Sequence, residues 1–216
     1  MTDDVLASQA AYYRRRAGEY DATAYGDLVA ARARIARLVA EMQPSGSVLE
    51  IACGTGMWTE ALATRVDSLT ALDVAPEALA IARERVTSDN VTFEVADIFS
   101  WNTSARFDVI FFSAWLSHVP TSRFDEFWQL LHGLLADGGR VLFIDEHVVE
   151  RAKESYLPDD DEIVERELQD GTTYRIVKNF VDPDQLELRL RDIGWACRIR
   201  RDDSEWVWVC GEARPI

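Results

Sequence analysis

Residues 48–59 read VLEIACGTGMWT and form the most informative stretch of the chain. The stretch begins as an apolar run typical of a buried strand, passes through Gly54-Thr55-Gly56, and continues into residues that favour a helix. Glycines suit such a turn because the chain bends tightly there, and because a ligand can approach a backbone that carries no Cβ. The stretch predicts a strand, a ligand-binding glycine loop and a helix in direct succession.

Aspartates follow two later apolar runs. Asp73 ends the run 68–74, and Asp97 follows the run 91–96. At the carboxyl edge of a parallel sheet, Asp73 could accept hydrogen bonds from both hydroxyls of a ribose, and Asp97 could meet an adenine amino group. An aspartate at a strand end is more often a helix cap or a turn residue. The glycine loop and both aspartates, in register on successive strands, predict a ligand with a nucleoside part.

Short apolar runs alternate with amphipathic segments along most of the chain. The predicted strands are 47–52, 68–74, 91–96, 107–112 and 139–145. The predicted helices are 27–42, 57–65, 76–87 and 121–136. This alternation, with near-continuous apolar strands, predicts a parallel sheet covered on both faces and connected by right-handed crossovers.

The alternation changes after residue 145. The later segments are an acidic loop at 159–162 (DDDE), two hairpin arms at 163–169 and 172–180, a helix at 183–193, and two β-like runs at 195–201 and 205–211. Asp170-Gly171 between the two arms is a typical turn dipeptide of a tight hairpin. The acidic loop is interpreted as a solvated turn, with a divalent-cation site as the less favoured alternative.

The hairpin carries three basic residues. A two-residue turn at Asp170-Gly171 predicts that Arg166 faces Arg175 directly, and Lys178 adds a third cation in the same segment. Like charges directly opposite each other destabilise a strand pair, so an anion is expected beside them. The hypothesis is an anionic ligand held by arginine forks and a lysine charge. The alternative is a solvated face on which acids pair with these bases.

Composition limits the kinds of partner. The chain has 216 residues, and 23 basic against 38 acidic side chains give a net charge of −15. Such a charge disfavours nucleic acid and anionic membranes as partners. No apolar run is long enough to span a bilayer, and no signal peptide is visible. Three cysteines, Cys53, Cys197 and Cys210, suit a reducing cytoplasm. We expect a single cytoplasmic domain over 1–216, with no prediction of its oligomeric state.

Together these features resemble those of class I S-adenosylmethionine (SAM)-dependent methyltransferases, closely over residues 10–145. The matching features are Glu50-x-x-x-Gly54-x-Gly56, LTALDVAPEALAIAR around Asp73, VADI at 95–98, FDVIFFSAWLSHV at 107–119 and LLADGGRVLF at 134–143. The chain has Ala52 where the family often has its first glycine, and an alanine fits if the backbone there is extended.

The resemblance implies a doubly wound, mostly parallel, seven-stranded Rossmann-like α/β fold, with its two late strands antiparallel at the sheet edge. It also implies a helical lid over residues 1–43 and a hairpin insertion over 146–182. The methionine end of SAM would lie on Glu50 and the Gly54–Gly56 backbone. The other cofactor residues implied are Trp58, Asp73 (ribose), Val74, Asp97 and Ile98 (adenine) and Ser113 (beside the sulfonium). The product would be S-adenosylhomocysteine (SAH).

A dinucleotide is the rival cofactor. Its fingerprint needs a third glycine at position 59, where this chain has Thr59, and the bulky Trp58 beside it would hinder the close helix approach that a pyrophosphate requires. SAM has no phosphate and needs no such approach. The sequence therefore favours SAM.

The acceptor is predicted to be a small molecule, because the motifs of the DNA-methylating enzymes are absent. His118 follows the fourth strand, where family members often present a residue to the acceptor; a polar loop histidine is the ordinary alternative, and His132 and His147 are weaker candidates. Tyr20 and Tyr25, in the lid segment, are predicted to contact substrate, with aromatic packing as the alternative.

The segment ERELQDGTTYRIVKNF, residues 165–180, resembles the corresponding part of phosphonate O-methyltransferases of the type that acts in dehydrophos antibiotic biosynthesis. This resemblance implies O-methylation of a small anionic metabolite, with an ionised phosphonate oxygen as the leading acceptor. Two alternatives stay open: N-methylation of a small amine with His118 as proton acceptor, and a SAM-binding regulatory subunit without turnover.

Overall fold

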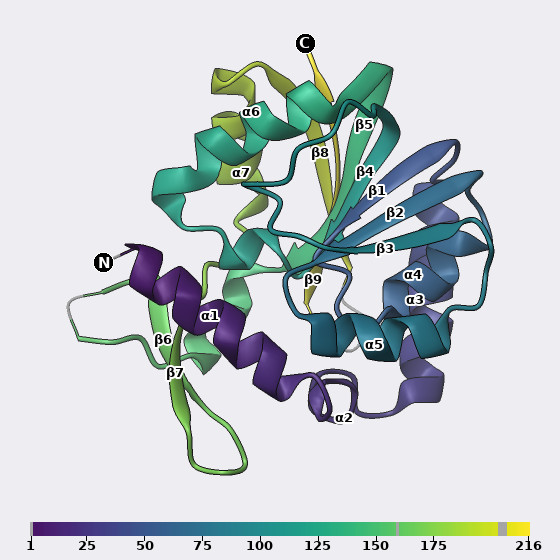
Figure 1. Cartoon of the computed structure of the whole chain (residues 1–216). Helices are drawn as coiled ribbons and strands as arrows, with labels where there is room; N and C mark the ends of the chain where they lie inside the picture. The colour runs from purple at the N-terminus through teal and green to yellow at the C-terminus, as the bar shows by residue number, and fades with distance from the viewer. Residues whose placement is uncertain (1, 159, 203–206) are drawn as a thin grey trace. The chain divides into compact units, whose positions relative to one another are not determined.

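The structure is a computed structural model that describes residues 2–158, 160–202 and 207–216. It contains a seven-stranded sheet in the order β3-β2-β1-β4-β5-β9-β8 and a separate two-stranded sheet, β6-β7 (Figure 1). The chain divides into two compact units. One comprises residues 13–111 and 134–139, and the other comprises residues up to Tyr12 with 112–133 and 140–216. We call them the glycine-loop unit and the hairpin unit.

In the glycine-loop unit, helices precede and connect parallel strands. The strands are β1 (Ser47–Ile51), β2 (Ser68–Asp73), β3 (Val91–Val95) and most of β4 (Phe107–Ser113), and the helices are α2 (Tyr20–Ala24), α3 (Leu28–Met42), α4 (Met57–Ala63) and α5 (Pro76–Arg85) (Figure 1). β1 pairs with β2 and β2 with β3, both in parallel. This register brings the ends of β1 and β2 together, since Ile51 lies opposite Leu72.

Local sequence explains where these helices begin. The Asp27 carboxylate accepts hydrogen bonds from the N–H groups of Val29 and Ala30, which caps α3. Pro76 occupies the first turn of α5, where a missing N–H costs nothing. The apolar face of α3 is buried, as its periodicity predicts.

The hairpin unit contains the antiparallel edge of the sheet. Its elements are most of β5 (Leu135–Glu146), β8 (Trp195–Asp202), β9 (Trp208–Pro215), α6 (Phe124–Leu134) and α7 (Pro183–Asp192), with most of α1 (Thr2–Arg16) at its start. β9 pairs antiparallel with both β5 and β8, which confirms the expected arrangement of the late strands. The helix expected over 121–136 ends at Leu134, and β5 begins earlier than expected. Of the expected run 205–211, residues 205 and 206 lie outside the described residues.

The predicted register of the hairpin is wrong by one residue. β6 (Ile163–Glu167) and β7 (Thr173–Val177) pair so that Arg166 faces Tyr174 and Arg175 faces Glu165. The turn has three residues, 169–171, instead of two. The Leu168 N–H donates to the Thr172 carbonyl, the Gly171 N–H donates to the Leu168 carbonyl, and Gly171 has φ +81°. Such a turn ends on a left-handed glycine and shifts the pairing by one position. The argument from facing arginines therefore fails.

The acidic loop is a capped turn in the part that the structure describes. The Asp160 carboxylate accepts hydrogen bonds from the N–H groups of Glu162 and Ile163, while Asp159 lies outside the described residues. None of the described helices is long and apolar enough to cross a membrane.

Candidate active site

The glycine loop between β1 and α4 combines close packing with open space. Gly56 precedes α4 with φ +82°, and a Cβ there would lie 3.0 Å from the Cβ of Ala82. At Gly54, with φ +55°, an added Cβ would meet no atom within 4 Å. Gly56 therefore allows α4 and α5 to approach each other, whereas the backbone at Gly54 borders unfilled space.

Ala52 adopts a left-handed backbone, contrary to the expectation of an extended one. Its φ is +55°, directly after β1. A residue with a Cβ is strained there, by roughly 1–2 kcal/mol. Ala52 thus adopts a backbone conformation that is usual for glycine.

Asp73 braces the glycine loop from the end of β2. Its Oδ2 accepts the Gly54 N–H at 2.8 Å, and its Oδ1 accepts the Ala75 N–H at 2.8 Å. Burial raises the pKa of Asp73, and these N–H groups oppose that shift. Because a carboxylate has about four lone-pair sites, each oxygen keeps capacity for a further donor such as a ribose hydroxyl.

Glu50 is a buried carboxyl group at the end of β1. Burial raises the pKa of Glu50 to about 8; the charge of Asp73 acts in the same direction, and the hydroxyl of Thr59 opposes it. Its Oε2 has no hydrogen-bond partner among the described residues. A buried acceptor without a donor is costly, and the ammonium group of a methionine moiety would supply both a donor and a positive charge. These features fit SAM.

The N-terminal segment is fastened to the glycine loop. Asp21 of α2 accepts a hydrogen bond from the Thr55 hydroxyl and forms an ion pair with Arg85, whose guanidinium also donates to the Thr55 carbonyl. Burial of its phenol raises the pKa of Tyr25 well above its ordinary value, and nearby Glu50 acts in the same direction. The structure thus brings Tyr25 close to the predicted cofactor residues, and the ring of Tyr20 lies 6.0 Å from that of Tyr25.

The remaining predicted cofactor residues differ in exposure. Asp97 is exposed, and its Oδ1 caps the following turn by accepting the Phe99 N–H at 3.0 Å. Ile98 is buried and Val74 half-buried. Trp58 is buried, with its ring 5.5 Å from that of Phe111, so its side chain belongs to the core. Ser113, half-buried at the end of β4, belongs to the hairpin unit.

In the hairpin unit, His118 is buried and held from two sides. Its Nδ1 lies 2.7 Å from the Val177 carbonyl oxygen, and its own carbonyl accepts a hydrogen bond from Gln9. Since a carbonyl can only accept, Nδ1 carries a proton, and it is Nε2 that bears the lone pair in the neutral form of the ring. By contrast, His132 is exposed, and His147 caps a short 3₁₀ turn through Val149 N–H.

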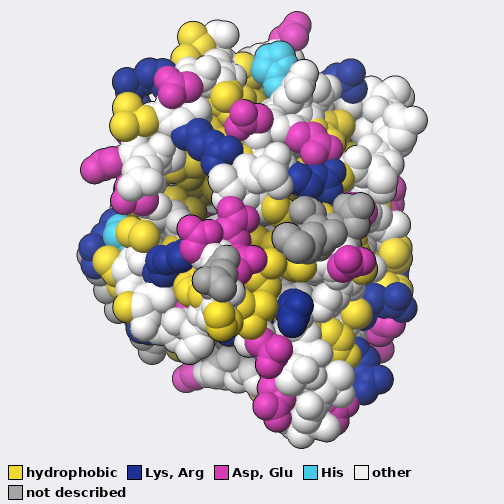
Figure 2. All heavy atoms as spheres, turned by 90° about the vertical axis from the view of Figure 1, so that its left-hand side faces the viewer, with side chains coloured by type: hydrophobic (Ala, Val, Ile, Leu, Met, Phe, Trp, Pro, Cys, Tyr) yellow, Lys and Arg dark blue, Asp and Glu magenta, His cyan; other side chains and the backbone are white. Residues whose placement is uncertain are grey.

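Each basic residue of the predicted anion site has an acidic neighbour. Lys178 Nζ lies 2.9 Å from Glu146 Oε1, and Arg166 forms an ion pair with Glu154. Arg175 is exposed opposite Glu165. On the face shown in Figure 2, basic side chains likewise lie between acidic ones. Lys178 alone of the predicted trio is buried.

Sequence reasoning missed the acidic pair that ends β5. Asp145 is fully buried and accepts the N–H groups of Ser117 and Glu146. Burial raises the pKa of Asp145 to about 6, although the charge of Lys178 opposes the shift. The available signal was an acidic dipeptide, Asp145-Glu146, at the end of an apolar run.

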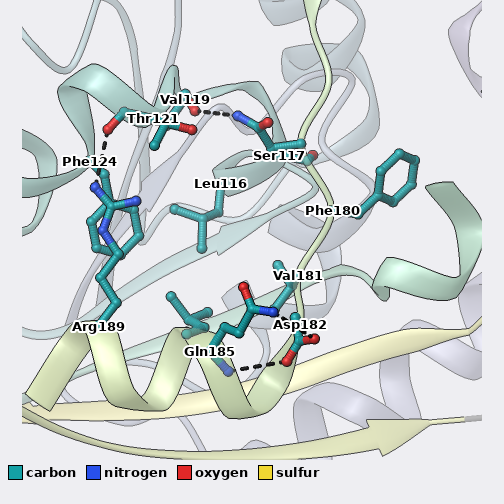
Figure 3. A pocket seen from close by; sticks show the side chains of 12 residues that line it. Leu116, Ser117, Val119, Thr121, Phe124, Phe180, Val181, Asp182, Gln185 and Arg189 are labelled. Atoms are coloured by element: carbon teal, nitrogen blue, oxygen red, sulfur yellow. Dashed lines mark hydrogen bonds between the residues drawn. The ribbon is translucent and has the colours of Figure 1, made fainter. Parts of the chain in front are cut away.

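A cavity of about 280 Å³ in the hairpin unit was also missed (Figure 3). It lies between the turn after β4 and the start of α7, with Leu116 in its wall and Arg189 stacked over Phe124 at 3.8 Å. The Ser117 hydroxyl in its lining has no hydrogen-bond partner among the described residues. No sequence pattern marks these residues, since they come from separate segments.

Known proteins share both the glycine-loop pattern and the fold. A family model described as "Methyltransferase domain" matches residues 48–139. The solved DhpI–SAH complex is 39% identical, with a TM-score of 0.84, over 100% of this chain and 98% of that one. The chain belongs to the SAM-dependent methyltransferases. SAM is therefore its family's cofactor, as the sequence predicts.

Other relatives agree with this membership. This methyltransferase is 37% identical to DhpI in a DhpI–SAM–HEP complex, with a TM-score of 0.83 and 98% of each chain covered. Nodulation protein S of Sinorhizobium fredii is 37% identical over 75 residues, which are 34% of this chain and 35% of that relative. The match thus spans about a third of that curated relative's length.

Proposed function

We propose that this methyltransferase transfers the methyl group of SAM to an oxygen of a small anionic acceptor, with a phosphonate as the leading candidate. The observation that carries the proposal is the likeness to DhpI, which extends over the whole chain and includes a complex with SAM and HEP. The buried ammonium group of Lys178, in the same unit as His118, Arg166 and Arg175, supports an anionic partner.

The cofactor would lie on the glycine-loop unit. Glu50 would accept from its ammonium group, Asp73 would accept from its ribose hydroxyls, and Asp97 with Ile98 would enclose its adenine. When bound, SAM supplies an electrophilic methyl carbon: the acceptor oxygen donates a lone pair to form the new C–O bond, and the C–S bond breaks with its electron pair left on sulfur, giving SAH.

The acceptor would be held by the hairpin unit. Lys178 would bind one anionic oxygen, and Arg166 and Arg175 would add positive charge. Tyr20 and Tyr25, which belong to the glycine-loop unit, would exclude water. An ionised phosphonate oxygen is already nucleophilic, so the work of the protein would be alignment of acceptor and methyl group. His118 would orient the acceptor without removing a proton.

N-methylation of a small amine is the second candidate. The observation in its favour is the tautomer of His118: with Nδ1 donating to Val177, the lone pair on Nε2 is suited to accept a proton. An amine acceptor would require such a base, because a protonated amine has no lone pair to donate.

The experiment is a screen with methyl-labelled SAM over alkylphosphonates, carboxylates, phenols and amines. We expect label in an alkylphosphonate monoester. Label only in amines would favour the N-methyltransferase, and binding of SAM without transfer to any acceptor would favour a regulatory subunit. SAM binding is measured in parallel by calorimetry, so that inactive protein is distinguished from a wrong acceptor.

A further inference from the structure

The Lys178–Glu146 ion pair is asymmetric in its exposure. The Lys178 side chain is 6% exposed and the Glu146 side chain 28% exposed, with Nζ and Oε1 2.9 Å apart. The more accessible member of the pair is thus the carboxylate. A molecule that reaches this pair from solvent meets negative charge as well as positive charge.

Both members have unused hydrogen-bonding capacity. The Lys178 ammonium has three N–H donors, and among the described residues Glu146 Oε1 is its only hydrogen-bond acceptor. Its other contact is the Phe180 ring, 5.1 Å from Nζ to the centroid. Likewise, Glu146 Oε2 receives no hydrogen bond from the described residues. A ligand with an anionic oxygen and an adjacent cationic donor would satisfy both groups.

The local charge also argues against a purely anionic ligand. Asp145, fully buried beside Glu146, interacts electrostatically with Lys178. The cluster therefore contains one base and two acids. A ligand with negative charge alone would gain from Lys178 and lose to the acids, whereas a zwitterion places each of its charges against an opposite one.

We propose that the Lys178–Glu146 pair selects zwitterionic acceptors, in which an ammonium group lies close to the anionic oxygens. Lys178 binds an oxygen that is not methylated, and Glu146 Oε2 accepts from the ammonium group. This inference rests on the proposed O-methyl transfer to a phosphonate and specifies its acceptor class.

The test uses three two-carbon alkylphosphonates that differ only at C2, which carries an ammonium group, a hydroxyl group or hydrogen. A charge-assisted hydrogen bond to a partly exposed carboxylate supports a preference of about 3- to 10-fold in kcat/KM for the ammonium compound over the unsubstituted one. Phosphorus NMR of the products reports O-methylation. Equal kcat/KM for these two compounds would overturn the inference and leave the proposed O-methyltransferase intact.

A variant pair locates the effect. Glu146→Gln keeps the size of the side chain and removes its charge. The variant should lose the preference, so that kcat/KM is about the same for the ammonium compound and the unsubstituted one. Glu212→Gln is the matched control, because Glu212 of β9 pairs with Arg140 and Arg214 and the change in charge is the same; it should keep the preference. A preference retained in Glu146→Gln would contradict the role of Glu146.

A failure of the proposed O-methyl transfer to a phosphonate would give a different experimental result. If none of the three compounds is methylated while SAM still binds, both the phosphonate acceptor and this inference are overturned. Methylation of the nitrogen in place of the oxygen would have the same consequence and would support the alternative N-methyltransferase. The comparison on the unmodified protein needs no variant, so a misfolded Glu146→Gln would not block the test.

Discussion

Asp73 Oδ2 accepts the backbone N–H of Gly54 at 2.8 Å, so the carboxylate that ends β2 holds the loop that follows β1. One side chain thus fixes the loop and offers its remaining lone pairs to the proposed ribose. Removal of the carboxylate should therefore loosen the loop and weaken cofactor binding at the same time.

Asp73→Ala should weaken the binding of SAM and SAH by about 2–4 kcal/mol, the cost of losing charge-assisted hydrogen bonds. Titration calorimetry measures the affinity. Asp89→Ala, at an exposed position of the same unit, is the control with the same loss of charge. An unchanged affinity in Asp73→Ala would exclude the ribose role.

Glu50 should make stability and binding depend on pH. Its folded pKa of about 8 lies above the ordinary 4.5, so its contribution to stability is complete below about pH 4.5 and disappears as the pH rises to about 8. Glu50→Gln should remove this component from the pH dependence of the unfolding free energy. SAM binding near pH 7 should release protons, because the ligand's ammonium group favours the ionised form of Glu50 and so lowers its pKa. Calorimetry in buffers of different ionisation enthalpy detects the release, which Glu50→Gln should abolish.

Ala52→Gly should stabilise the protein by about 0.5–1 kcal/mol. Relief of the left-handed strain, roughly 1–2 kcal/mol, outweighs the extra entropy of glycine in the unfolded chain. Ala61→Gly, inside helix α4, is the opposite control and should destabilise by about 1 kcal/mol. Urea denaturation of both variants measures the difference; destabilisation in both would contradict the strain at position 52.

His118→Ala should separate the two candidate reactions. With an ionised phosphonate as acceptor, the variant should show the same pH profile of kcat/KM as the unmodified protein between pH 6 and 9. With an amine as acceptor, the titration of an imidazole base should disappear from the profile. Exposed His132→Ala is the control for general effects of losing an imidazole.

Lys178→Gln should lower kcat/KM for the acceptor roughly 10- to 150-fold, as expected for a lost charge-assisted contact of about 1.5–3 kcal/mol, and should leave SAM affinity unchanged. Arg175→Gln should have a smaller effect because Arg175 is exposed. Steady-state kinetics beside a SAM titration distinguish the two variants. A normal acceptor KM in Lys178→Gln would rule out the anion-binding role.

The sequence predicted those parts of the fold in which local pattern determines structure. The strands β1 and β2, before and after Gly54, and the late strand β8 lie where the apolar periodicity placed them, whereas β9 extends to Pro215, beyond the predicted run 205–211. The hairpin register was missed because a single extra turn residue changes the partner of every residue in a strand, and Asp170-Gly171 fits both turn lengths. Ala52 was missed because residue type alone does not reveal a strained φ.

The same distinction applies to the site. Asp73 and Glu50 belong to a local motif, and the structure gives each a buried environment suited to a ligand. The partners of Lys178 are distant in sequence, so pattern alone could show the charge of Lys178 but not that Glu146 balances it. Interactions between segments that are far apart in the chain have no periodicity to detect.

The contacts of Thr55 bear on the thermodynamics of ligand binding. Its hydroxyl is held by Asp21 and its carbonyl by Arg85, in the middle of the glycine loop. A loop fixed in this way before any ligand arrives is preorganised, so little conformational entropy is lost when a ligand binds. Loosening the loop through Asp21→Ala would therefore appear in calorimetry as a larger entropic penalty of ligand binding.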